Sequence, residues 1–441
     1  MNKLRDKFVD STVEEERLRE NRNHEKYWYR WGPYLSERSW ATVREDYSLN
    51  GDAWSNFPFE HANARVFRWG EDGLFGVSDN KQLVCMNVAL WNGKDERLKE
   101  RLFGLTGPQG NHGEDVKELY FYLDNTPTHS YMKALYKYPF KKAFPYKELV
   151  QKNGERGYED KEFEVYDIDG LYRDSETGDN PYFDVFFEMA KDDENPSELN
   201  FRLTIHNRSK IDSGELYIAP QLFFRNTWAF DGTRTKDKPL LERDAEAANL
   251  INMTHKKYGN CQMVFQPSPG GFSSGTNEEE EDEEVEDIDP LLLFTDNESN
   301  LVKLFNEEKN PSEYTKDAFE EYLVQGKTDA VNPENKGTKA CAVYHFKNIP
   351  PGEYVTVRYK FTNDPKNSIF KAQNLAVVDE DEFDLIFDNR EEEADNFYWR
   401  ITPLPISDEL RNLQRQAFSG LLWTKQFYNF TYDAWYNGDA N

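Results

Sequence analysis

Two runs of alternating apolar and polar residues, joined by a proline-proline-glycine turn, constrain the fold of this chain more than any other feature. They lie within residues 339–362, which read KACAVYHFKNIPPGEYVTVRYKFT. Alternation with a period of two places every second side chain on the same face of a strand. Pro350 and Pro351 fix φ, and Gly352 supplies the reverse bend. The segment therefore predicts two strands joined by a turn.

Similar short runs occur along much of the chain. One region, Arg65–Trp91, contains alternating segments between glycines. Further strand candidates are Phe163–Tyr166, Tyr182–Ala190, Leu199–Asn207, Gly214–Phe230 and Cys261–Gln266. Many short strands separated by turns are typical of antiparallel sandwiches, and an aromatic content of 15% supplies large side chains for a core. We therefore expect a mainly β fold, with a large antiparallel β-sandwich superdomain over residues 31–363.

The first thirty residues predict an N-terminal helical segment. Ser11 or Thr12 can cap a helix that extends to Glu25, because three glutamates follow in its first turn. The segment is charged throughout, and it contains neither the apolar centre of a signal peptide nor a membrane span. We therefore expect a cytoplasmic location and no membrane partner.

The other end of the sequence predicts more helices. Residues 364–405 are expected to form a helical linker, because apolar residues recur at helical spacing from Val378 to Ile401. Residues 406–441 begin a further helical unit, in which Ser407 caps a helix. Four apolar residues share one face of that helix: Leu410, Leu413, Ala417 and Leu421. Such a face needs a partner.

Charge and cysteine content exclude several classes of protein. A formal net charge of −28 opposes binding to nucleic acid and to anionic membrane surfaces. Cys85, Cys261 and Cys341 lie far apart without a C-x-x-C spacing, which excludes a disulfide framework and a cysteine zinc site. We expect no nucleic-acid partner, no metal and no other cofactor.

Two acidic segments interrupt the strand region. Residues 174–180, DSETGDN, carry the oxygen ligands of a calcium loop, but the glycine comes one place early and no glutamate closes the loop. We interpret this segment as an ordinary acidic turn. Residues 278–289 include ten acidic residues. Repulsion between like charges predicts a disordered acidic insertion there.

A glycine-rich stretch at residues 97–138 is the first candidate for a site. Glycines recur every three residues before a dense aromatic run, and a long aperiodic loop of this kind typically carries a ligand or an interface. The loop contains His112, Glu114 and Asp115. His112 can hold the loop by bonding to backbone, or the three residues can border a cleft. No further histidines follow at metal-ligand spacing.

A tryptophan-rich block at residues 27–59 is the second candidate. It contains Trp28, Trp31, Trp40 and Trp54 among turn residues. These side chains can pack against the first sheet, or they can form a sugar-stacking or domain-contact surface, because indole faces suit both roles.

Four blocks of the chain resemble the N-terminal half of glycoside hydrolase family 63, and together they span nearly its whole length. They are WGPYLSERSWATVREDYSLNGDAW at 31–54 and RVFRWGEDGLFGVSDNKQLVCMNVALWNGKD at 65–95, followed by 100–139 and 413–430. The family includes the processing mannosyl-oligosaccharide glucosidases and their microbial and fungal relatives. The lack of a signal segment favours a cytosolic relative.

The resemblance implies a division of labour. In this family a β-sandwich superdomain precedes an (α/α)6 barrel, and the barrel carries two catalytic carboxylates that act with inversion. Inversion needs carboxyl groups about 6.5 to 9.5 Å apart, with a water molecule between them and the sugar. The helix at 407–430 resembles the first barrel helix, and both catalytic positions are expected beyond Asn441. The resemblance therefore assigns no catalytic residue here. It implies an oligosaccharide or glucoside substrate and a separate C-terminal catalytic half as partner.

Three functions remain open. The chain can be the non-catalytic N-terminal portion of an inverting α-glucosidase-type hydrolase, inactive alone. It can be a carbohydrate-binding or scaffold protein derived from that enzyme. It can be a self-sufficient enzyme that takes its carboxylate pair from the acids of the two candidate segments. The candidates for a substrate cleft or domain contact are Trp40, Glu45, Asp46, Trp54, His112, Glu114 and Asp115.

Overall fold

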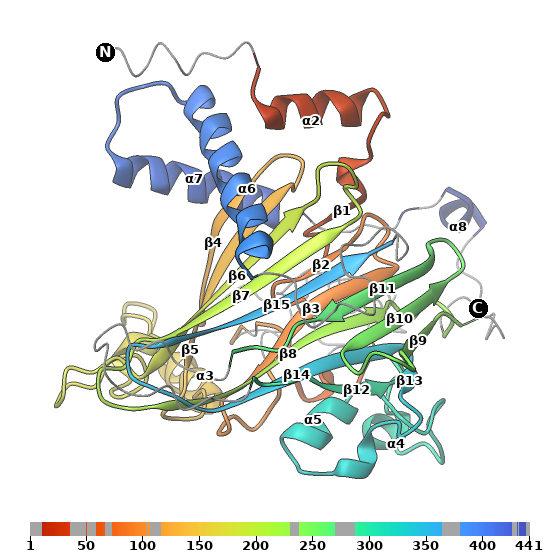
Figure 1. Cartoon of the computed structure of the whole chain (residues 1–441). Helices are drawn as coiled ribbons and strands as arrows, with labels where there is room; N and C mark the ends of the chain where they lie inside the picture. The colour runs from red at the N-terminus through yellow and green to blue at the C-terminus, as the bar shows by residue number, and fades with distance from the viewer. Residues whose placement is uncertain are drawn as a thin grey trace, which may run out of the picture.

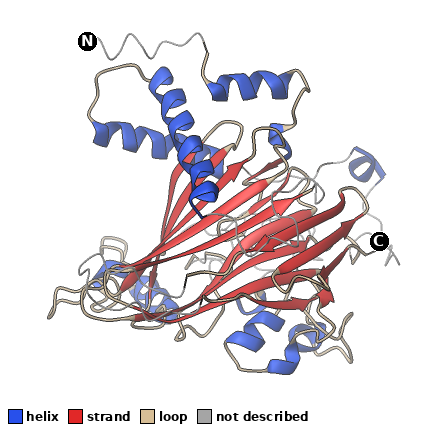
Figure 2. Ribbon diagram, viewed as in Figure 1, coloured by secondary structure: helices blue, strands red, loops and turns tan. Residues whose placement is uncertain are grey.

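The protein is mainly β and is built around two large antiparallel sheets that share one apolar core (Figures 1 and 2). The computed structural model describes residues 11–35, 50, 59–66, 73–102, 104–105, 116–229, 238–269, 287–363, 380–425, 430 and 432–437. The predicted mainly β sandwich is confirmed. Helices gather at one end of the sandwich and along its lower margin in Figure 1.

Within the described residues, one sheet has six strands and the other has nine. The first runs in the order β1 (Trp31–Gly32), β2 (Val77–Asp79), β3 (Val84–Trp91), β8 (Gly214–Phe224), β14 (Lys339–Ile349) and β12 (Leu291–Thr295). The second runs in the order β13 (Lys336–Gly337), β9 (Leu240–Arg243), β10 (Leu250–His255), β11 (Gly259–Phe265), β15 (Tyr354–Thr362), β7 (Leu199–Asn207), β6 (Tyr182–Lys191), β5 (Tyr131–Pro139) and β4 (Leu119–Asn125).

The proline-proline-glycine turn joins the two sheets rather than two neighbouring strands. β14 pairs with β8 and β12 in one sheet, whereas β15 pairs with β11 and β7 in the other. Gly352 has a φ of 79°, which suits glycine because it has no Cβ to clash. Both strands are therefore confirmed, and the turn carries the chain across the core.

The core lies between the inner faces of the two sheets. Phe201 and Tyr359 stack there with ring centroids 4.7 Å apart, and Phe187 packs beside them. Val88 and Leu222 reach the same core from the six-stranded sheet. Removal of this apolar surface from water is the main stabilising contribution to a fold of this kind.

Short helices and turns complete the sandwich. The structure contains α3 (Tyr146–Glu155), α4 (Leu301–Phe305), α5 (Ala318–Leu323), and the 3-10 turns Trp28–Arg30, Phe59–His61, Val165–Asp167 and Thr328–Ala330. The predicted strand at 163–166 is wrong. The backbone N–H of Glu164 donates to the Asp167 carboxylate and that of Asp167 donates to the Glu164 carbonyl, and this exchange closes a 3-10 turn.

The two acidic segments have different outcomes. Asp174 accepts backbone hydrogen bonds from Glu176 and Thr177, so residues 174–180 fold back on themselves as the predicted acidic turn. Most of the predicted insertion at 278–289 lies outside the described residues. Its last apolar residue, Ile288, forms an isolated β-bridge with Ser268, because Ile288 packs against the core. The three cysteines form no disulfide.

The N-terminal helix α2 (Val13–Arg22) begins with a capping box, which confirms a helix in this segment. Thr12 rather than Ser11 is the cap: its side chain accepts from the Glu15 backbone, and the Glu15 carboxylate accepts from the Thr12 backbone.

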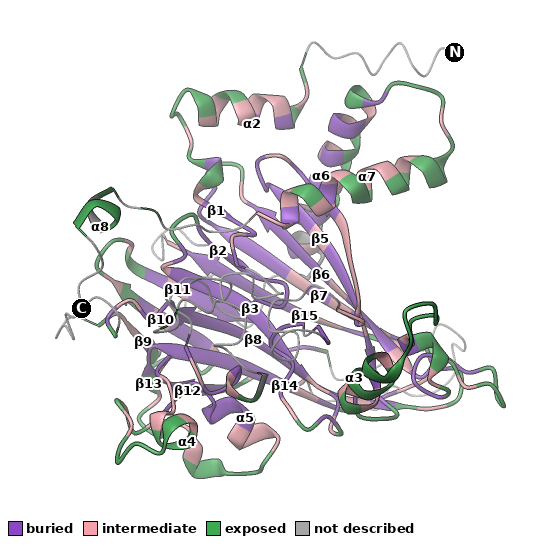
Figure 3. Cartoon of the chain, turned by 180° about the vertical axis from the view of Figure 1, so that it is seen from behind, coloured by how far each residue is buried: buried purple, intermediate pink, exposed green. Residues whose placement is uncertain are grey.

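The C-terminal helices α6 (Glu380–Ile401) and α7 (Asp408–Trp423) lie over the β4 end of the sandwich, opposite to α3 (Figures 1 and 3). Ser407 caps α7 by accepting from the Leu410 backbone, as predicted. A short helix, α8 (Tyr432–Asn437), follows. Among the described helices, none combines the length and the apolar character that crossing a membrane requires.

The two sheets approach each other closely at Gly337. A Cβ at this position of β13 would lie 2.1 Å from the backbone oxygen of Thr295, at the end of β12 in the other sheet. We expect Gly337→Ala to lower the free energy of unfolding by about 1–3 kcal/mol, since backbone must shift to admit the methyl group. Urea unfolding followed by circular dichroism measures this change.

Gly154→Ala is the matched control. Gly154 lies in α3, and no heavy atom is within 4 Å of its added Cβ. We expect this variant to gain about 0.5–1 kcal/mol, because alanine loses less backbone entropy than glycine in a helix. Equal stability of the two variants would contradict the close approach of the sheets.

Candidate functional site

The seven residues named as cleft or contact candidates all lie outside the described residues. These are Trp40, Glu45, Asp46, Trp54, His112, Glu114 and Asp115. Trp28 and Trp31, from the same tryptophan-rich block, are described and buried. Trp31 packs edge-on against Phe361 at 5.1 Å, and the Trp28 indole donates to Glu20 at 2.8 Å. The packing interpretation is therefore confirmed for Trp31, whereas Trp28 is buried against α2.

A buried ion pair joins the segment before residues 103–115 to the segment after them. Lys99 precedes the glycine-rich segment and Glu118 follows it, and the Lys99 ammonium donates to the Glu118 carboxylate. The side chains are 3% and 0% exposed. Lys99 also donates to the Tyr146 hydroxyl, and the Tyr136 hydroxyl donates to Glu118 at 3.1 Å. Because a buried charge without a partner is costly, this pair fixes where the segment leaves and re-enters the sandwich.

The next residue along the chain is anchored in another direction. The Glu100 carboxylate accepts from the Lys339 ammonium and from the Gln221 amide, each at 2.8 Å, and these partners lie on β14 and β8. An antiparallel bridge between Leu90 and Lys99 holds the backbone of this segment against β3. Consecutive side chains thus tie residues 98–101 to α3 on one side and to the six-stranded sheet on the other.

A third buried carboxylate completes this anchoring. Glu320 of α5 accepts from the Leu98 backbone at 3.2 Å and from the Asn63 amide. Burial raises the pKa of Glu320, while Arg97 and the hydrogen bonds oppose that rise. Glu320 therefore joins α5 to Asn63 and to the backbone of Leu98.

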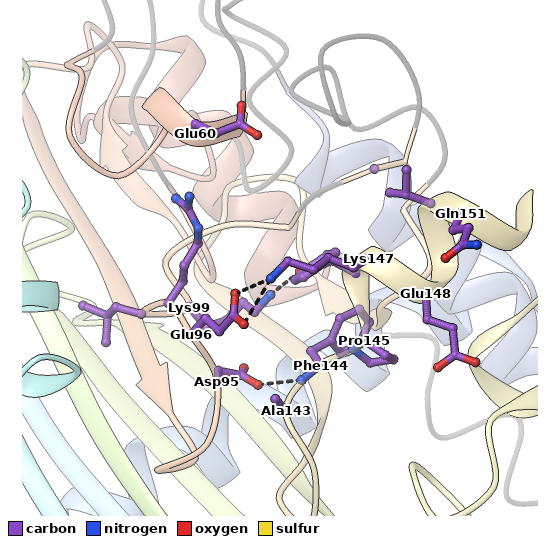
Figure 4. A pocket seen from close by; sticks show the side chains of 15 residues that line it. Glu60, Asp95, Glu96, Lys99, Ala143, Phe144, Pro145, Lys147, Glu148 and Gln151 are labelled. Atoms are coloured by element: carbon purple, nitrogen blue, oxygen red, sulfur yellow. Dashed lines mark hydrogen bonds and ion pairs between the residues drawn. The ribbon is translucent and has the colours of Figure 1, made fainter. Parts of the chain in front are cut away.

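A cavity of about 760 Å³ lies beside this anchored segment (Figure 4). Residues 95–99 form one wall, and the start of α3 forms another, with Glu60 across from it. Phe144, Tyr146 and Val150 supply apolar surface. The rim carries an exposed ion pair between Lys147 and Glu96 at 3.1 Å. The volume falls in the range of small-ligand sites, about 300–1,000 Å³.

Asp95 and Tyr146, two polar residues of the cavity lining, are engaged in hydrogen bonds within the protein. The Asp95 carboxylate accepts from the Phe144 backbone at 2.7 Å and from the Tyr138 hydroxyl at 2.6 Å. Burial raises the pKa of the Tyr146 hydroxyl, and the charge of Glu118 raises it further. The cavity thus combines apolar walls with charged side chains of both signs.

The second candidate region is the contact between α7 and the nine-stranded sheet. The Trp423 indole is buried, stacks on Tyr122 with centroids 5.7 Å apart, and donates to the Asp124 carbonyl at 2.9 Å. Arg415 donates to the Asp124 carboxylate at 2.5 Å and to Asp395 of α6. Burial raises the pKa of Asp124, and Arg415 opposes that rise. Helix α7 is therefore built into the sandwich.

Comparison with protein-family models gives no match. The resemblance to family 63 therefore rests on the four sequence blocks. Within the part of the chain that the structure describes, no group of three or more histidine, cysteine or acidic side chains could hold a metal ion.

The sequence did not indicate the anchoring residues Lys99, Glu100, Glu118 and Lys339. In RLKERLF and DVKELYF they read as ordinary surface charges, because a pattern of residue types does not show which charge faces which. Lys99 and Glu100 stand in a run of three charged residues, Lys99–Arg101, which is typical of a solvated surface.

The Lys99–Glu118 pair is testable by removing one charge or both. We expect Lys99→Met to lower the free energy of unfolding by about 3–5 kcal/mol, because Glu118 would keep a buried charge without its cation. We expect the double variant Lys99→Met/Glu118→Leu to recover at least half of that loss. Chemical unfolding of the two variants measures both values. A double variant less stable than Lys99→Met would contradict the pairing.

Proposed function

We propose that this chain is the non-catalytic N-terminal portion of an inverting α-glucosidase-type glycoside hydrolase of family 63 type. In this proposal it acts in the cytoplasm on oligosaccharides or glucosides, together with a separate C-terminal catalytic half. The single observation that carries the proposal is helix α7, one face of which is built into the sandwich while the opposite face turns apolar side chains outward.

The two faces of α7 are separated by residue spacing. Arg415, Ser419 and Trp423 follow one another at intervals of four and point into the joint with β4. The opposite face carries leucines that are 54%, 65% and 74% exposed: Leu410, Leu413 and Leu421. An apolar stripe of this kind on a helix typically marks an interface. The family resemblance supplies the occupant, which is the remainder of an (α/α)6 barrel with α7 as its first helix.

In this proposal the chemistry is divided between two units. The helical half supplies the acid and the base that inversion requires. This chain supplies the first barrel helix and holds it at a fixed position through Trp423 and Arg415. The anchored ends at Lys99 and Glu118 hold the glycine-rich segment, whose His112, Glu114 and Asp115 we propose as residues at the cleft edge.

The test compares the protein isolated from its own cells with the 441-residue chain made alone. We expect the isolated material to include a helical catalytic half, detected by intact mass. We expect it to release glucose from α-glucosides as the β-anomer, followed by proton NMR, since inversion reverses the anomeric configuration. We expect no glucose from the 441-residue chain alone. Turnover by the chain alone would contradict the proposal and favour a self-sufficient enzyme.

Charges on the outer face of α7 sharpen the test. The double variant Leu413→Glu/Leu421→Glu leaves the contacts of Trp423 and Arg415 in place, and we expect at least a tenfold loss of glucose release. Ile211→Glu, at a similarly exposed position in the loop between β7 and β8, is the control and should keep full activity. Full activity in the double variant would exclude this face as the contact with the catalytic half.

A second candidate function is favoured by the cavity beside α3. A carbohydrate-binding protein needs apolar surface for the face of a sugar ring and polar groups for its edges, and the cavity walls offer both. Helix α3, which lines the cavity, lies at the end of the sandwich away from α7 (Figures 1 and 3), so this function does not require the helical half.

Filling the cavity distinguishes this candidate. Val150 lines the cavity and is 38% exposed, so Val150→Trp would occupy it without removing a hydrogen bond. If the chain binds maltose or a related glucoside, we expect Val150→Trp to weaken the affinity at least tenfold in isothermal titration calorimetry. Val302→Trp in α4, where valine is 41% exposed, is the matched control. Undetectable binding by the unaltered chain would eliminate the candidate.

A further inference from the structure

Three distant parts of the chain meet at the turn between β4 and β5, residues 126–130. From α2, the Glu14 carboxylate accepts from the Thr128 backbone at 2.7 Å and from the Ser130 hydroxyl at 2.8 Å. From the end of β6, the Lys191 ammonium donates to the Thr128 carbonyl at 3.0 Å. From the residues after α7, the Lys425 ammonium reaches His129. The turn thus connects α2, the end of β6 and the residues that follow α7.

His129 is the central residue of this turn. It is fully buried and has a φ of 56°, a left-handed conformation that is uncommon for residues other than glycine. The imidazole Nδ1 is 2.8 Å from the Asn125 side-chain oxygen, and Nε2 is 2.9 Å from the Lys425 ammonium. The residue therefore touches β4 through one ring nitrogen and the α7 end through the other.

These partners fix the protonation state of the ring. An ammonium can only donate, so Nε2 must accept from Lys425 and carry no proton. The amide oxygen of Asn125 can only accept, so Nδ1 carries the proton and donates. Both contacts are satisfied by the neutral imidazole alone. A proton on Nε2 would face the donors of Lys425 and break that bond.

The charged surroundings oppose a second positive charge. The titratable and charged groups that face the turn from the packed elements are Glu14, Arg17, Tyr29, Tyr34, Lys191 and Lys425. Glu14 is the acid among them, and its oxygens accept from Thr128 and Ser130. Burial, together with the charges of Lys425 and Lys191, holds the pKa of His129 well below its ordinary value. Burial also lowers the pKa of Lys425.

We propose that the hydrogen bond between His129 and Lys425 is a pH-dependent latch that holds the C-terminal end of α7 on the β4–β5 turn and releases it in acid. The latch is closed while His129 is neutral. Opening moves Lys425 away and exposes the ring, which can then take a proton from solvent. This inference does not depend on the proposed hydrolase function.

The direction of the pH effect follows from linkage. The pKa of His129 is depressed in the closed form and returns to about 6.5 in the open form. The latch therefore keeps its full strength above about pH 6.5. Below that value the open population increases about tenfold for each pH unit. Burial raises the pKa of Glu14, which acts with the opposite sign. A variant at position 129 separates the two effects.

Hydrogen exchange measured by mass spectrometry tests the latch in the 441-residue chain. The protection factor, which corrects for the intrinsic pH dependence of exchange, is compared at pH 7.5 and pH 4.5. We expect it to fall about a hundredfold for amides in residues 419–425, by the same linkage. We expect a much smaller change in β8 and β14, in the centre of the six-stranded sheet. A parallel fall in those strands would mean global destabilisation and would overturn the proposal.

Two variants and a matched control complete the test. His129→Gln keeps an amide oxygen for Lys425 but cannot titrate, so we expect the hundredfold fall to disappear. Lys425→Met removes the donor, so we expect low protection of residues 419–425 at both pH values. His206→Gln replaces a half-buried histidine on β7, whose pKa burial also lowers, and should keep the fall. An unchanged pH response in both His129→Gln and Lys425→Met would overturn the latch.

Discussion

Paired burial of charge along residues 98–101 is the constraint on which the arrangement of the sandwich depends. Lys99 and Glu100 are consecutive, yet one is neutralised by Glu118 and the other by Lys339, far away in the sequence. Neither charge could be buried alone without a penalty of several kcal/mol. Strand β14, the start of β4 and the entrance to α3 must therefore all be in place together. Burial of apolar surface drives the two sheets together, and these ion pairs fix the position of the segments around them.

The sequence was most informative about single strands. Leu199–Asn207 was predicted with the bounds that β7 has, and the prediction for β6 was short by one residue. Alternation identifies a strand because it describes the two faces of one segment. Alternation does not identify which strands pair, so the sequence could not show that the proline-proline-glycine turn crosses between the sheets. The error at 163–166 has a related cause, since four residues are too few to separate a strand from a 3-10 turn.

The functional regions were harder to predict, for two physical reasons. The spacing of Leu410, Leu413 and Leu421 indicated the outer face of α7. The buried inner face combines Arg415, Ser419 and Trp423, and a search for apolar residues does not find it because two of these are polar. His129 gave no signal, because its role depends on Lys425, almost three hundred residues later. The two segments that drew most attention, around Trp40 and His112, lie outside the described residues, so their roles stay predictions.

The position of α7 beside β4 has a consequence for solubility. Among the strands that the structure describes, β4 is the last of the nine-stranded sheet, and its sequence, LYFYLDN, is rich in aromatic and leucine side chains. An uncovered strand at the border of a sheet offers free backbone donors and acceptors to another chain and can start aggregation. Helix α7 packs against this strand and fastens to it through Trp423 and Arg415. Because the Trp423 indole takes up the backbone carbonyl of Asp124, the helix leaves one acceptor fewer for another chain. Any shorter version of the protein that is meant to stay monomeric should therefore retain α7.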